Sequence, residues 1–374
     1  MRALNIFVII LSVLGLSAFS LVFVYSSTMG DSDSLQVSSL GLTAFQKQLV
    51  FYGGGLGMFY ALSRFPYRHW MGVALFLYVA NLLLLVYVWQ FGVIRGGARS
   101  WIDLKVTLFQ PSETMKTAWL LYLCSWLRYR KKLRHFQGLF MPFLITFIPM
   151  FLVLLQPDMG TAGLYIPTLF ILLYLCGARR KHLLLIISFM ILSLIPLWFF
   201  GLKGYQKARV MALVHPEEHA LGTGYQMNHS LLAIGEGHWL GKGVGEGRVN
   251  RLNLLPESHT DFIFSIIAEE LGFVGASMLI LLYLSLFLSC IWLGGRTREP
   301  YGRFLAFGIG SLLAAQTFIN LGVAMGLLPT TGITLPFVSS GGSSFISCCI
   351  MAGIVLSIAR HHVPVLSKDD FKEM

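Results

Sequence analysis

The sequence has few charged residues for its length. Only 12% of its 374 residues are charged, with 28 Lys and Arg against 17 Asp and Glu, whereas soluble domains average about 25%. So few charges cannot cover the surface of a soluble protein in which 56% of residues are hydrophobic. The composition therefore excludes an ordinary cytosolic enzyme and predicts that lipid solvates most of the surface.

Cysteine is also scarce, and its placement argues against a disulfide framework or a metal site. The five cysteines all lie in or beside apolar runs, as small core residues do: Cys124, Cys176, Cys290, Cys348 and Cys349. Intrinsic disorder is excluded as well, because the chain carries 29 Phe, 14 Tyr and 8 Trp.

Apolar runs long enough to cross a bilayer follow one another along almost the whole chain. A hydrocarbon core about 30 Å thick needs roughly 20 apolar residues in a helix. The sequence therefore predicts an all-α, polytopic integral membrane protein with one membrane domain, residues 1–374. The ten expected spans are 5–25, 44–62, 70–91, 111–127, 138–155, 160–177, 182–200, 260–293, 302–327 and 342–360.

Lys and Arg are distributed unequally between alternate connections. One side, which includes both ends of the chain, carries 17 of them, against five in the short connections of the other side and six in one long connection. The positive-inside rule then places both termini, including the tail 361–374, in the cytoplasm. Membrane orientation explains the net charge of +11, and no nucleic-acid partner is expected.

The long polar connection, residues 202–259, is then expected outside the cytoplasm. It shows no obvious helix of its own, and such connections are usually functional. Its glycine-rich stretch from Gly235 to Gly247 fits no nucleotide-binding motif. We interpret it as a close-packed re-entrant or hairpin loop under a lipid headgroup. The next apolar run is too long for one straight crossing, so a kink is expected at Gly272 or Gly275.

Charged residues at the membrane boundary are the first candidates for function. Glu113 and Lys116 stand three positions apart at the expected start of the fourth span, so they share a helix face and can pair. A helix-start device, with Pro111 in the first turn, explains them equally well. Asp158 lies in a short turn between two spans, where a carboxylate that caps the next helix is the first interpretation.

The segment LLPESHTDFIFSIIAEELG combines acidic residues with an apolar run. If Pro256 starts a helix, Glu257 and Asp261 lie four apart on one face at the outer membrane surface. Paired carboxylates can supply a general base in a partly desolvated site, although two acids at a helix start also fit its dipole. Deeper in this helix, at least one of Glu269 and Glu270 needs a partner or a polar cavity.

The connection between the last two spans is irregular. Prolines, glycines and serines interrupt the apolar pattern at residues 325–344. Irregular backbone at membrane depth is stable only where it is buried or lines a cavity. We therefore predict a re-entrant element that closes the outer site. The scattered histidines lack the spacing of a zinc site, and no protein-built metal site is expected.

Seven segments resemble, in order, the successive motifs of the SEDS family (shape, elongation, division and sporulation). They extend from about residue 95 to residue 350, and two of them look more like the rod-shape branch, whereas VGEGRVN is closer to the division branch. The segments are GARSWIDLKVTLFQPSETMK, LLQPDMGTA, WFFGLKGYQKARV, LGTGYQ, GKGVGEG, LLPESHTDFIFSIIAEELGFVG and NLGVAMGLLPTTGITLPFVSSGGSS.

This resemblance implies a SEDS-type (GT-C-like) fold in the bacterial cytoplasmic (inner) membrane. It implies a peptidoglycan glycosyltransferase that polymerises lipid II, an undecaprenyl-pyrophosphate-linked disaccharide pentapeptide, on the extracytoplasmic face during elongation of rod-shaped cells. The implied partners are lipid II, membrane lipid, a class B penicillin-binding protein transpeptidase and other proteins of the elongation complex.

Carried over residue by residue, the resemblance places the essential carboxylate at Asp261, with Glu257 beside it. The residues implied to contact substrate are Arg99, Glu113, Lys116, Asp158, Gln226, His259 and Ser343. Arg99 and Lys116 are the candidates for holding the anionic pyrophosphate. No cofactor is certain, and a divalent cation (Mg²⁺ or Mn²⁺) is the one candidate, because a pyrophosphate leaving group needs cationic or metal stabilisation.

Other functions fit parts of the same pattern. A lipid II flippase or another transporter would explain ten spans with intramembrane Glu269 and Glu270. Against it, the informative polar residues gather on the outer side rather than at the midplane, and no inverted repeat is evident. A scaffold for the transpeptidase is a third interpretation, and a division-specific polymerase is the alternative within the glycosyltransferases.

Overall fold

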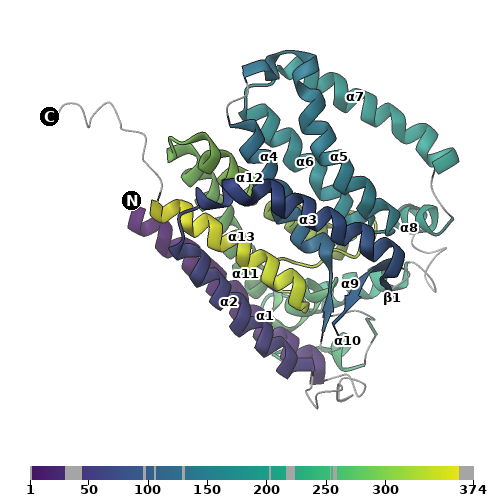
Figure 1. Ribbon diagram of the computed structural model, residues 1–374. Helices are drawn as coiled ribbons and strands as arrows, with labels where there is room; N and C mark the ends of the chain where they lie inside the picture. The colour runs from purple at the N-terminus through teal and green to yellow at the C-terminus, as the bar shows by residue number, and fades with distance from the viewer. Residues whose placement is uncertain are drawn as a thin grey trace.

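The structure is a helical bundle with one small β-ribbon (Figure 1). It is a computed structural model that describes residues 2–29, 44–95, 98–104, 107–128, 131–201, 204–215, 224–252, 254–255 and 259–361. Its helices are α1 (Arg2–Met29), α2 (Ala44–Arg64), α3 (His69–Phe91), α4 (Pro111–Leu127), α5 (Phe140–Leu155), α6 (Met159–Leu175), α7 (Arg180–Pro196), α8 (Gly204–Val214), α9 (Tyr225–Glu236), α10 (Arg248–Arg251), α11 (Ile263–Arg296), α12 (Pro300–Ala324) and α13 (Gly342–His361). Short 3₁₀ turns cover Lys131–Arg134 and Phe136–Leu139, and a π-turn covers Leu197–Gly201.

Ten of these helices coincide with the ten predicted spans: α1 to α7 and α11 to α13. Because the bilayer core offers no hydrogen bonds to the backbone, apolar runs of this length must be helical. Among the described residues, six segments are long and apolar enough to cross a membrane alone: Arg2–Ser26, His69–Phe91, Phe136–Leu155, Ile263–Arg296, Pro300–Ala324 and Gly342–His361. The all-α, multi-pass prediction is confirmed.

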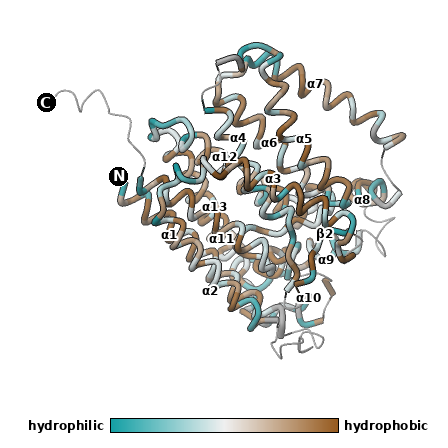
Figure 2. The backbone as a smooth tube through the Cα atoms, in the orientation of Figure 1, coloured by the Kyte–Doolittle hydropathy of each residue, from teal (hydrophilic) through white to brown (hydrophobic). Residues whose placement is uncertain are grey.

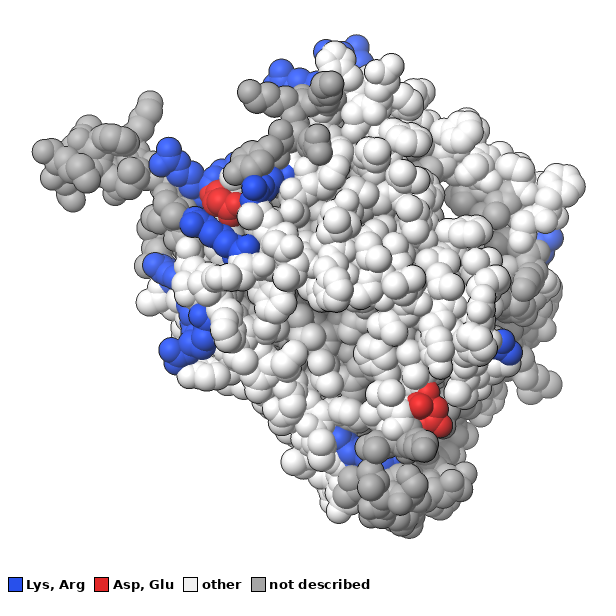
Figure 3. All heavy atoms as spheres, viewed as in Figure 1, with Lys and Arg blue, Asp and Glu red and all other residues white. Residues whose placement is uncertain are grey.

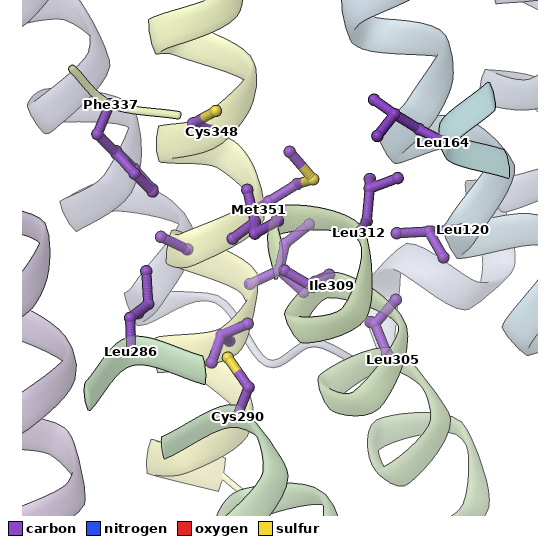
Figure 4. Close-up of a cluster of buried hydrophobic side chains, with 14 of the residues drawn as sticks. Leu120, Leu164, Leu286, Cys290, Leu305, Ile309, Leu312, Phe337, Cys348 and Met351 are labelled. Carbon is purple, nitrogen blue, oxygen red and sulfur yellow. The ribbon is translucent and has the colours of Figure 1, made fainter. Parts of the chain in front are cut away.

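The core lies where α11, α12 and α13 meet α4 and α6. In α13, 78% of the apolar stretch is buried inside the protein, against 22% in the peripheral α3, so α13 is a central helix. Figure 4 shows how side chains of these helices fill this region, among them Leu120, Leu286, Ile309 and Met351.

The outer surface is apolar over a broad band. Brown, hydrophobic backbone dominates α3, α5 and α7 in Figure 2. In Figure 3, Lys and Arg gather near the two termini and at the top of the view, while the face between them shows almost no charge. Large apolar side chains such as Phe76 of α3 and Phe189 of α7 are exposed. This is the surface expected of a protein solvated by lipid.

A three-stranded antiparallel ribbon between α3 and α4 was not among the predicted elements. It consists of β1 (Val93–Arg95), β2 (Ala98–Asp103) and β3 (Leu108–Phe109), in that order. Residues 98–103 pair with both neighbours, for example Ile102 with Phe109. Such short strands carry too little periodicity to stand out beside long apolar helices.

The long connection 202–259 contains helices, contrary to the expectation of a stretch without a helix of its own. α8, α9 and α10 lie within it, and α9 packs along α11. Each is short, with only part of its surface apolar, so helical periodicity was hard to recognise in the sequence. Residues 202–203, 216–223, 253 and 256–258 of this connection lie outside the described residues.

The predicted kink in α11 is confirmed at Gly272, which has a φ of 65°. The glycine-rich loop fills the break, because Phe273 N–H donates to His238 O at 2.8 Å and Lys242 N–H donates to Glu269 O at 3.1 Å. A side chain at Gly241 would meet Glu270 O at 2.1 Å. The loop therefore needs glycine here to pack directly on the helix backbone.

Glu269 and Glu270 are buried beside this kink, and both have hydrogen-bond partners. The sequence predicts a partner or a polar cavity for at least one of them. Glu270 accepts hydrogen bonds from Ser26 Oγ at 2.6 and 2.8 Å and from Gly245 N–H at 2.9 Å. Glu269 Oε1 accepts from Val249 N–H at 3.0 Å and lies 3.8 Å from Lys242 Nζ. The two carboxylates thus fasten the glycine-rich loop to α11.

The helix that follows the acidic segment, α11, starts at Ile263. Asp261 lies in a turn just before it, so it is not on a helical face, and the predicted start at Pro256 lies outside the described residues. The carbonyls of residues 259–261 accept hydrogen bonds from α12 and from the segment before α13, described below. Glu257 itself lies outside the described residues.

Candidate functional site

The predicted pair of Glu113 and Lys116 is present and buried. Lys116 Nζ lies 2.8 Å from Glu113 Oε1, and the side chains are 1% and 6% exposed for Lys116 and Glu113. Lys116 Nζ also donates to Gln316 Oε1 at 3.1 Å. A buried ion pair is retained only when such further hydrogen bonds offset its desolvation. Lys116 is therefore enclosed in the bundle and not on an outer surface.

Asp158 caps α6, as predicted, and also joins two other elements. Its Oδ1 accepts from Thr161 N–H at 3.0 Å, and its Oδ2 accepts from Gln110 Nε2 at 3.3 Å. Asp158 lies in the turn between α5 and α6, where burial raises the pKa of its carboxyl and the Thr161 hydrogen bonds oppose that shift. The carboxyl thus ties the start of α6 to the start of α4.

Ser343 belongs to the same polar network. Its Oγ accepts from Gln110 N–H at 3.2 Å and donates to Leu108 O at 3.3 Å. One turn further along α13, Ser347 Oγ donates to Glu113 O at 2.8 Å. Glu113 N–H donates to Gln110 O at 3.2 Å and so joins this group to the ion pair. We call Gln110, Glu113, Lys116, Asp158, Gln316 and Ser343 the buried polar network, although Gln110, Asp158 and Ser343 are only half-buried.

Asp261 is held in place by its backbone. Ser340 N–H and Ser340 Oγ each donate to His259 O at 2.9 Å, and Ser339 Oγ donates to Thr260 O. Asn320 Nδ2 then donates to Asp261 O at 2.9 Å. Three consecutive carbonyls are therefore fixed by α12 and by the serine-rich segment before α13.

That segment, residues 325–341, is irregular, as predicted, and its second half, residues 333–339, is largely buried. Leu335, Phe337 and Val338 are almost fully buried, and Tyr283 Oη donates to Pro336 O at 2.5 Å. Its beginning packs against α6, because a side chain at Gly160 would meet Thr331 O at 2.7 Å. Buried irregular backbone of this kind is tolerated in membrane proteins.

A cavity of about 150 Å³ opens beside Asp261. Its polar lining brings together four separate parts of the chain: α8, the first turn of α9, the turn before α11 and the irregular segment. The lining residues are Arg209, Gln226, Asp261, Phe262, Val323, Thr330, Thr331 and Gly332. Binding sites for small molecules are usually larger, about 300 to 1,000 Å³, but they share this feature of a few convergent polar groups.

The predicted residues thus separate into two groups. Asp261 and Gln226 share the cavity, whereas Glu113, Lys116, Asp158 and Ser343 belong to the buried polar network. The side chain of His259 is exposed, and its backbone carbonyl accepts the hydrogen bonds from Ser340 described above. Arg99, in β2, is exposed and donates to Gln90 O at 3.1 Å, and it lines neither group.

Two amides on α12 connect the groups and were missed in the sequence. Gln316 accepts from Lys116, and its Nε2 donates to Thr334 O at 3.0 Å. Asn320, one turn later, donates to Ile333 O at 2.7 Å as well as to Asp261 O. Their spacing of four on an apolar helix was the available signal, because buried amides in membrane helices mark functional or packing contacts.

The described residues contain no cluster of three or more His, Cys, Asp or Glu side chains that could hold a metal ion. Within this part of the chain, Asp261 is the carboxylate that lines the cavity. A bound cation would therefore have to share that carboxylate with oxygens of a substrate.

Comparison with known proteins identifies the family. The profile of the FtsW/RodA/SpoVE cell cycle protein family matches residues 6–363. The chain belongs to this family. Its members are the SEDS proteins, so the resemblance found in the sequence is confirmed.

Curated members of the FtsW/RodA/SpoVE family are similar over most of this chain. Peptidoglycan glycosyltransferase MrdB of Escherichia coli K12 is 38% identical over 84% of this chain and 85% of its own length. Probable peptidoglycan glycosyltransferase FtsW of Xanthomonas oryzae is 38% identical over 88% and 68%. Stage V sporulation protein E of Bacillus subtilis is 37% identical over 84% and 87%.

Solved structures of the family share this fold. A chain of a peptidoglycan synthase complex, solved to explain how polymerization and crosslinking are coordinated, superposes with a TM-score of 0.79 at 32% identity, over 94% of this chain and 96% of that one. Thermus thermophilus RodA superposes with a TM-score of 0.69 at 30% identity, over 94% and 95%. The enzyme class is therefore peptidoglycan glycosyltransferase of the SEDS family.

Proposed function

We propose that this glycosyltransferase polymerises lipid II into glycan strands and that Asp261 is its catalytic base. The observation that carries the proposal is the placement of Asp261. It borders a polar cavity, and hydrogen bonds to three consecutive carbonyls fix its backbone. A base works best when its geometry is set before the substrate arrives.

The reaction needs one proton acceptor and one leaving group. An acceptor sugar hydroxyl forms a bond to the anomeric carbon of the donor sugar, and the bond from that carbon to the diphosphate oxygen breaks. The hydroxyl proton passes to the Asp261 carboxylate, and the diphosphate leaves with the bonding electron pair. Asp261 supplies general-base catalysis, which typically contributes about 10²- to 10⁴-fold in rate.

The buried polar network has a supporting role in this proposal. It contains a paired charge and several amides and hydroxyls, and it contacts the irregular segment through Thr334. That segment also forms the cavity wall at Thr330, Thr331 and Gly332. We therefore assign Glu113 and Lys116 to positioning of the wall.

The residues that line the cavity could bind a divalent cation together with the phosphate oxygens of the substrate. Mg²⁺ is commonly held by one or two carboxylates together with substrate phosphates. Here Asp261 would provide the carboxylate and the substrate would provide the phosphate oxygens. When bound, Mg²⁺ or Mn²⁺ would neutralise charge on the leaving diphosphate.

We further propose that the reaction takes place on the outer face of the cytoplasmic membrane, with both termini in the cytoplasm. The distribution of Lys and Arg supports this orientation. In Figure 1 the start of α1 and the end of α13 lie near each other at one end of the bundle, far from α9 and α10. The first turn of α9 carries Gln226, which lines the cavity.

For the cellular role, we propose elongation of rod-shaped cells. The motif WID after GAR and the motif WFFGLKGYQKARV support this branch, while curated relatives of similar identity carry the names MrdB, FtsW and SpoVE. The second candidate is division. A fluorescent fusion expressed in dividing cells separates them: sidewall patches support elongation, whereas septal bands support division.

We propose a class B penicillin-binding protein as the crosslinking partner, with other elongation proteins around it. The similar chain from a peptidoglycan synthase complex that couples polymerization to crosslinking supports this. Co-purification of the full chain with candidate transpeptidases from the same cells tests it. Failure of every class B candidate to co-purify would contradict the proposal.

The central test uses the purified full chain with labelled lipid II. Glycan ladders are the expected product. Lipid II that crosses vesicle membranes without forming ladders would instead indicate a transporter. A chain that forms no ladders and moves no lipid II, but activates the partner transpeptidase, would be a scaffold.

A further inference from the structure

The cavity beside Asp261 contains a cation that the sequence motifs had not singled out. Arg209, on α8, lines the cavity with Gln226 and Thr331. The two basic residues first considered for pyrophosphate do not line this cavity: Lys116 is enclosed with Glu113, and Arg99 lies on β2. Arg209 itself is exposed. Among the described residues, Arg209 is the basic residue that lines this cavity.

Arg209 is placed to offer several hydrogen bonds to one ligand. Its Nη1 donates to Thr330 O at 3.1 Å, which holds the guanidinium against the cavity wall. A guanidinium has five N–H donors, and its planar arrangement matches phosphate oxygens in pairs. One anchoring bond therefore leaves most of its donors for a ligand.

The neighbouring wall supplies a second polar group. Thr331 Oγ1 is buried and has no hydrogen-bond partner among the described residues. A buried hydroxyl without a partner costs free energy, so such a group is satisfied by a bound water, ion or ligand. The adjacent Gly332 has a φ of 73°, and a side chain there would lie 3.8 Å from Asp261 Oδ2. Glycine thus keeps the space beside the carboxylate open.

We propose that Arg209, with Thr331, is the phosphate-binding end of the cavity and receives the diphosphate of the lipid-linked donor. This inference rests on the proposed function and assigns the leaving-group half of the same site. The acceptor hydroxyl gives its proton to Asp261 at one end. At the other end, the diphosphate departs with its electron pair and its added negative charge meets Arg209.

This arrangement places a carboxylate and a guanidinium in the lining of one cavity. Arg209 is fixed to Thr330 O, on the irregular segment, while Asp261 is fixed through its backbone to Asn320. Preorganised charge of this kind stabilises a developing anion more effectively than water does. It also predicts that binding depends on the diphosphate and weakens with salt.

Binding of short lipid diphosphates tests the assignment directly. The probe is farnesyl diphosphate, with farnesol as the matched lipid lacking phosphate and inorganic pyrophosphate as the matched anion lacking lipid. All are measured on the purified full chain in nanodiscs. We expect Arg209→Gln to weaken farnesyl diphosphate binding about tenfold or more, with farnesol binding unchanged. Arg209→Lys should recover part of the loss, because it restores the charge but not the paired geometry.

Two control variants define the outcome. Lys207→Gln removes a cation two positions earlier on α8, whose Nζ donates to Phe199 O, and should bind farnesyl diphosphate as the wild type does. Asp261→Asn should retain or improve that binding. Pyrophosphate that competes with farnesyl diphosphate in the wild type but not in Arg209→Gln would identify the anion as the recognised group.

The inference and the proposed function fail in different ways. If the wild type forms glycan ladders and Arg209→Gln, folded by thermal melting, binds farnesyl diphosphate equally well, the assignment of Arg209 is wrong while polymerisation stands. If the wild type binds farnesyl diphosphate through Arg209 but forms no ladders from lipid II, the site assignment holds and the polymerase proposal fails. Equal loss of farnesol and farnesyl diphosphate binding in Arg209→Gln would reduce Arg209 to a structural residue.

Discussion

Asn320 joins the candidate base to the irregular segment that forms the cavity wall. Its Nδ2 lies 2.9 Å from Asp261 O and 2.7 Å from Ile333 O, and the residue is 1% exposed. Gln316, one turn earlier on α12, makes the equivalent connection between Lys116 and Thr334. The position of Asp261 is thus coupled through one helix to the ion pair of α4.

Replacing Asn320 with Ala should impair catalysis more than substrate binding. Two buried carbonyls lose their donor, at about 1 to 3 kcal/mol for each group left unsatisfied, and the turn that carries Asp261 is loosened. We expect kcat to fall at least tenfold with a smaller change in KM, together with a lower melting temperature. Ser311→Ala is the matched control, because its hydroxyl bonds only within α12 to Gly308 O among the described contacts. A larger effect on KM than on kcat would contradict this role.

The pair of Glu113 and Lys116 should show strong coupling. Removal of one partner leaves an uncompensated buried charge, which typically costs about 3 to 5 kcal/mol. Lys116→Met and Glu113→Gln should therefore each destabilise the protein more than the double variant does. Thermal unfolding of all four proteins gives the coupling free energy. Additive effects would mean that the two side chains act separately.

Two variants of Asp158 separate its role as a helix cap from the role of its charge. Asp158→Ala removes the cap and should cost about 1 kcal/mol, whereas Asp158→Asn keeps a capping oxygen. Because the pKa of Asp158 is raised in the folded state, ionisation disfavours folding. This penalty is absent at low pH and grows as pH rises through the range of an ordinary carboxyl.

The stability of Asp158→Asn relative to wild type should therefore improve between about pH 4 and pH 7. Thermal melts across that range measure it. A relative stability that is independent of pH would contradict the raised pKa. Loss of glycan synthesis in a stable Asp158→Asn protein would show that the charge itself serves the reaction.

The kink at Gly272 should tolerate no side chain. Its φ is 65°, and an added methyl group would lie 2.3 Å from Gly241 N, so the glycine-rich loop would have to move. Gly272→Ala should lower the melting temperature and expose the loop to proteases. Gly295→Ala is the matched control on the same helix, where an added methyl group meets no atom within 4 Å. Equal protease sensitivity of the two variants would contradict the packing described for this loop.

Features determined by local sequence were predictable. Each of the ten spans follows from a continuous apolar run, and the kink at Gly272 follows from a helix too long for the bilayer. The pairing of Glu113 with Lys116 needs only a spacing of three, and the cap at Asp158 needs only a short turn. All of these depend on residues that are close in the chain.

Features that depend on contacts between distant parts of the chain could not be predicted from the sequence. Arg209 reaches the cavity because α8 folds back onto the segment after α12, and hydrophobic periodicity carries no information about that contact. Asp261 lies in a turn before α11, where Ser339, Ser340 and Asn320 donate to the carbonyls of residues 259–261. No local pattern in the acidic segment could have revealed donors some 60 to 80 residues away.

The most direct test of the account is glycan synthesis from purified lipid II by Asp261→Asn. The substitution keeps the shape of the side chain and removes its charge, so the variant should insert, melt like the wild type and co-purify with its transpeptidase. The account predicts no glycan ladders from this folded variant, while wild type in the same membranes forms them. Ladders at a rate close to wild type would contradict the assignment of Asp261 as the catalytic base.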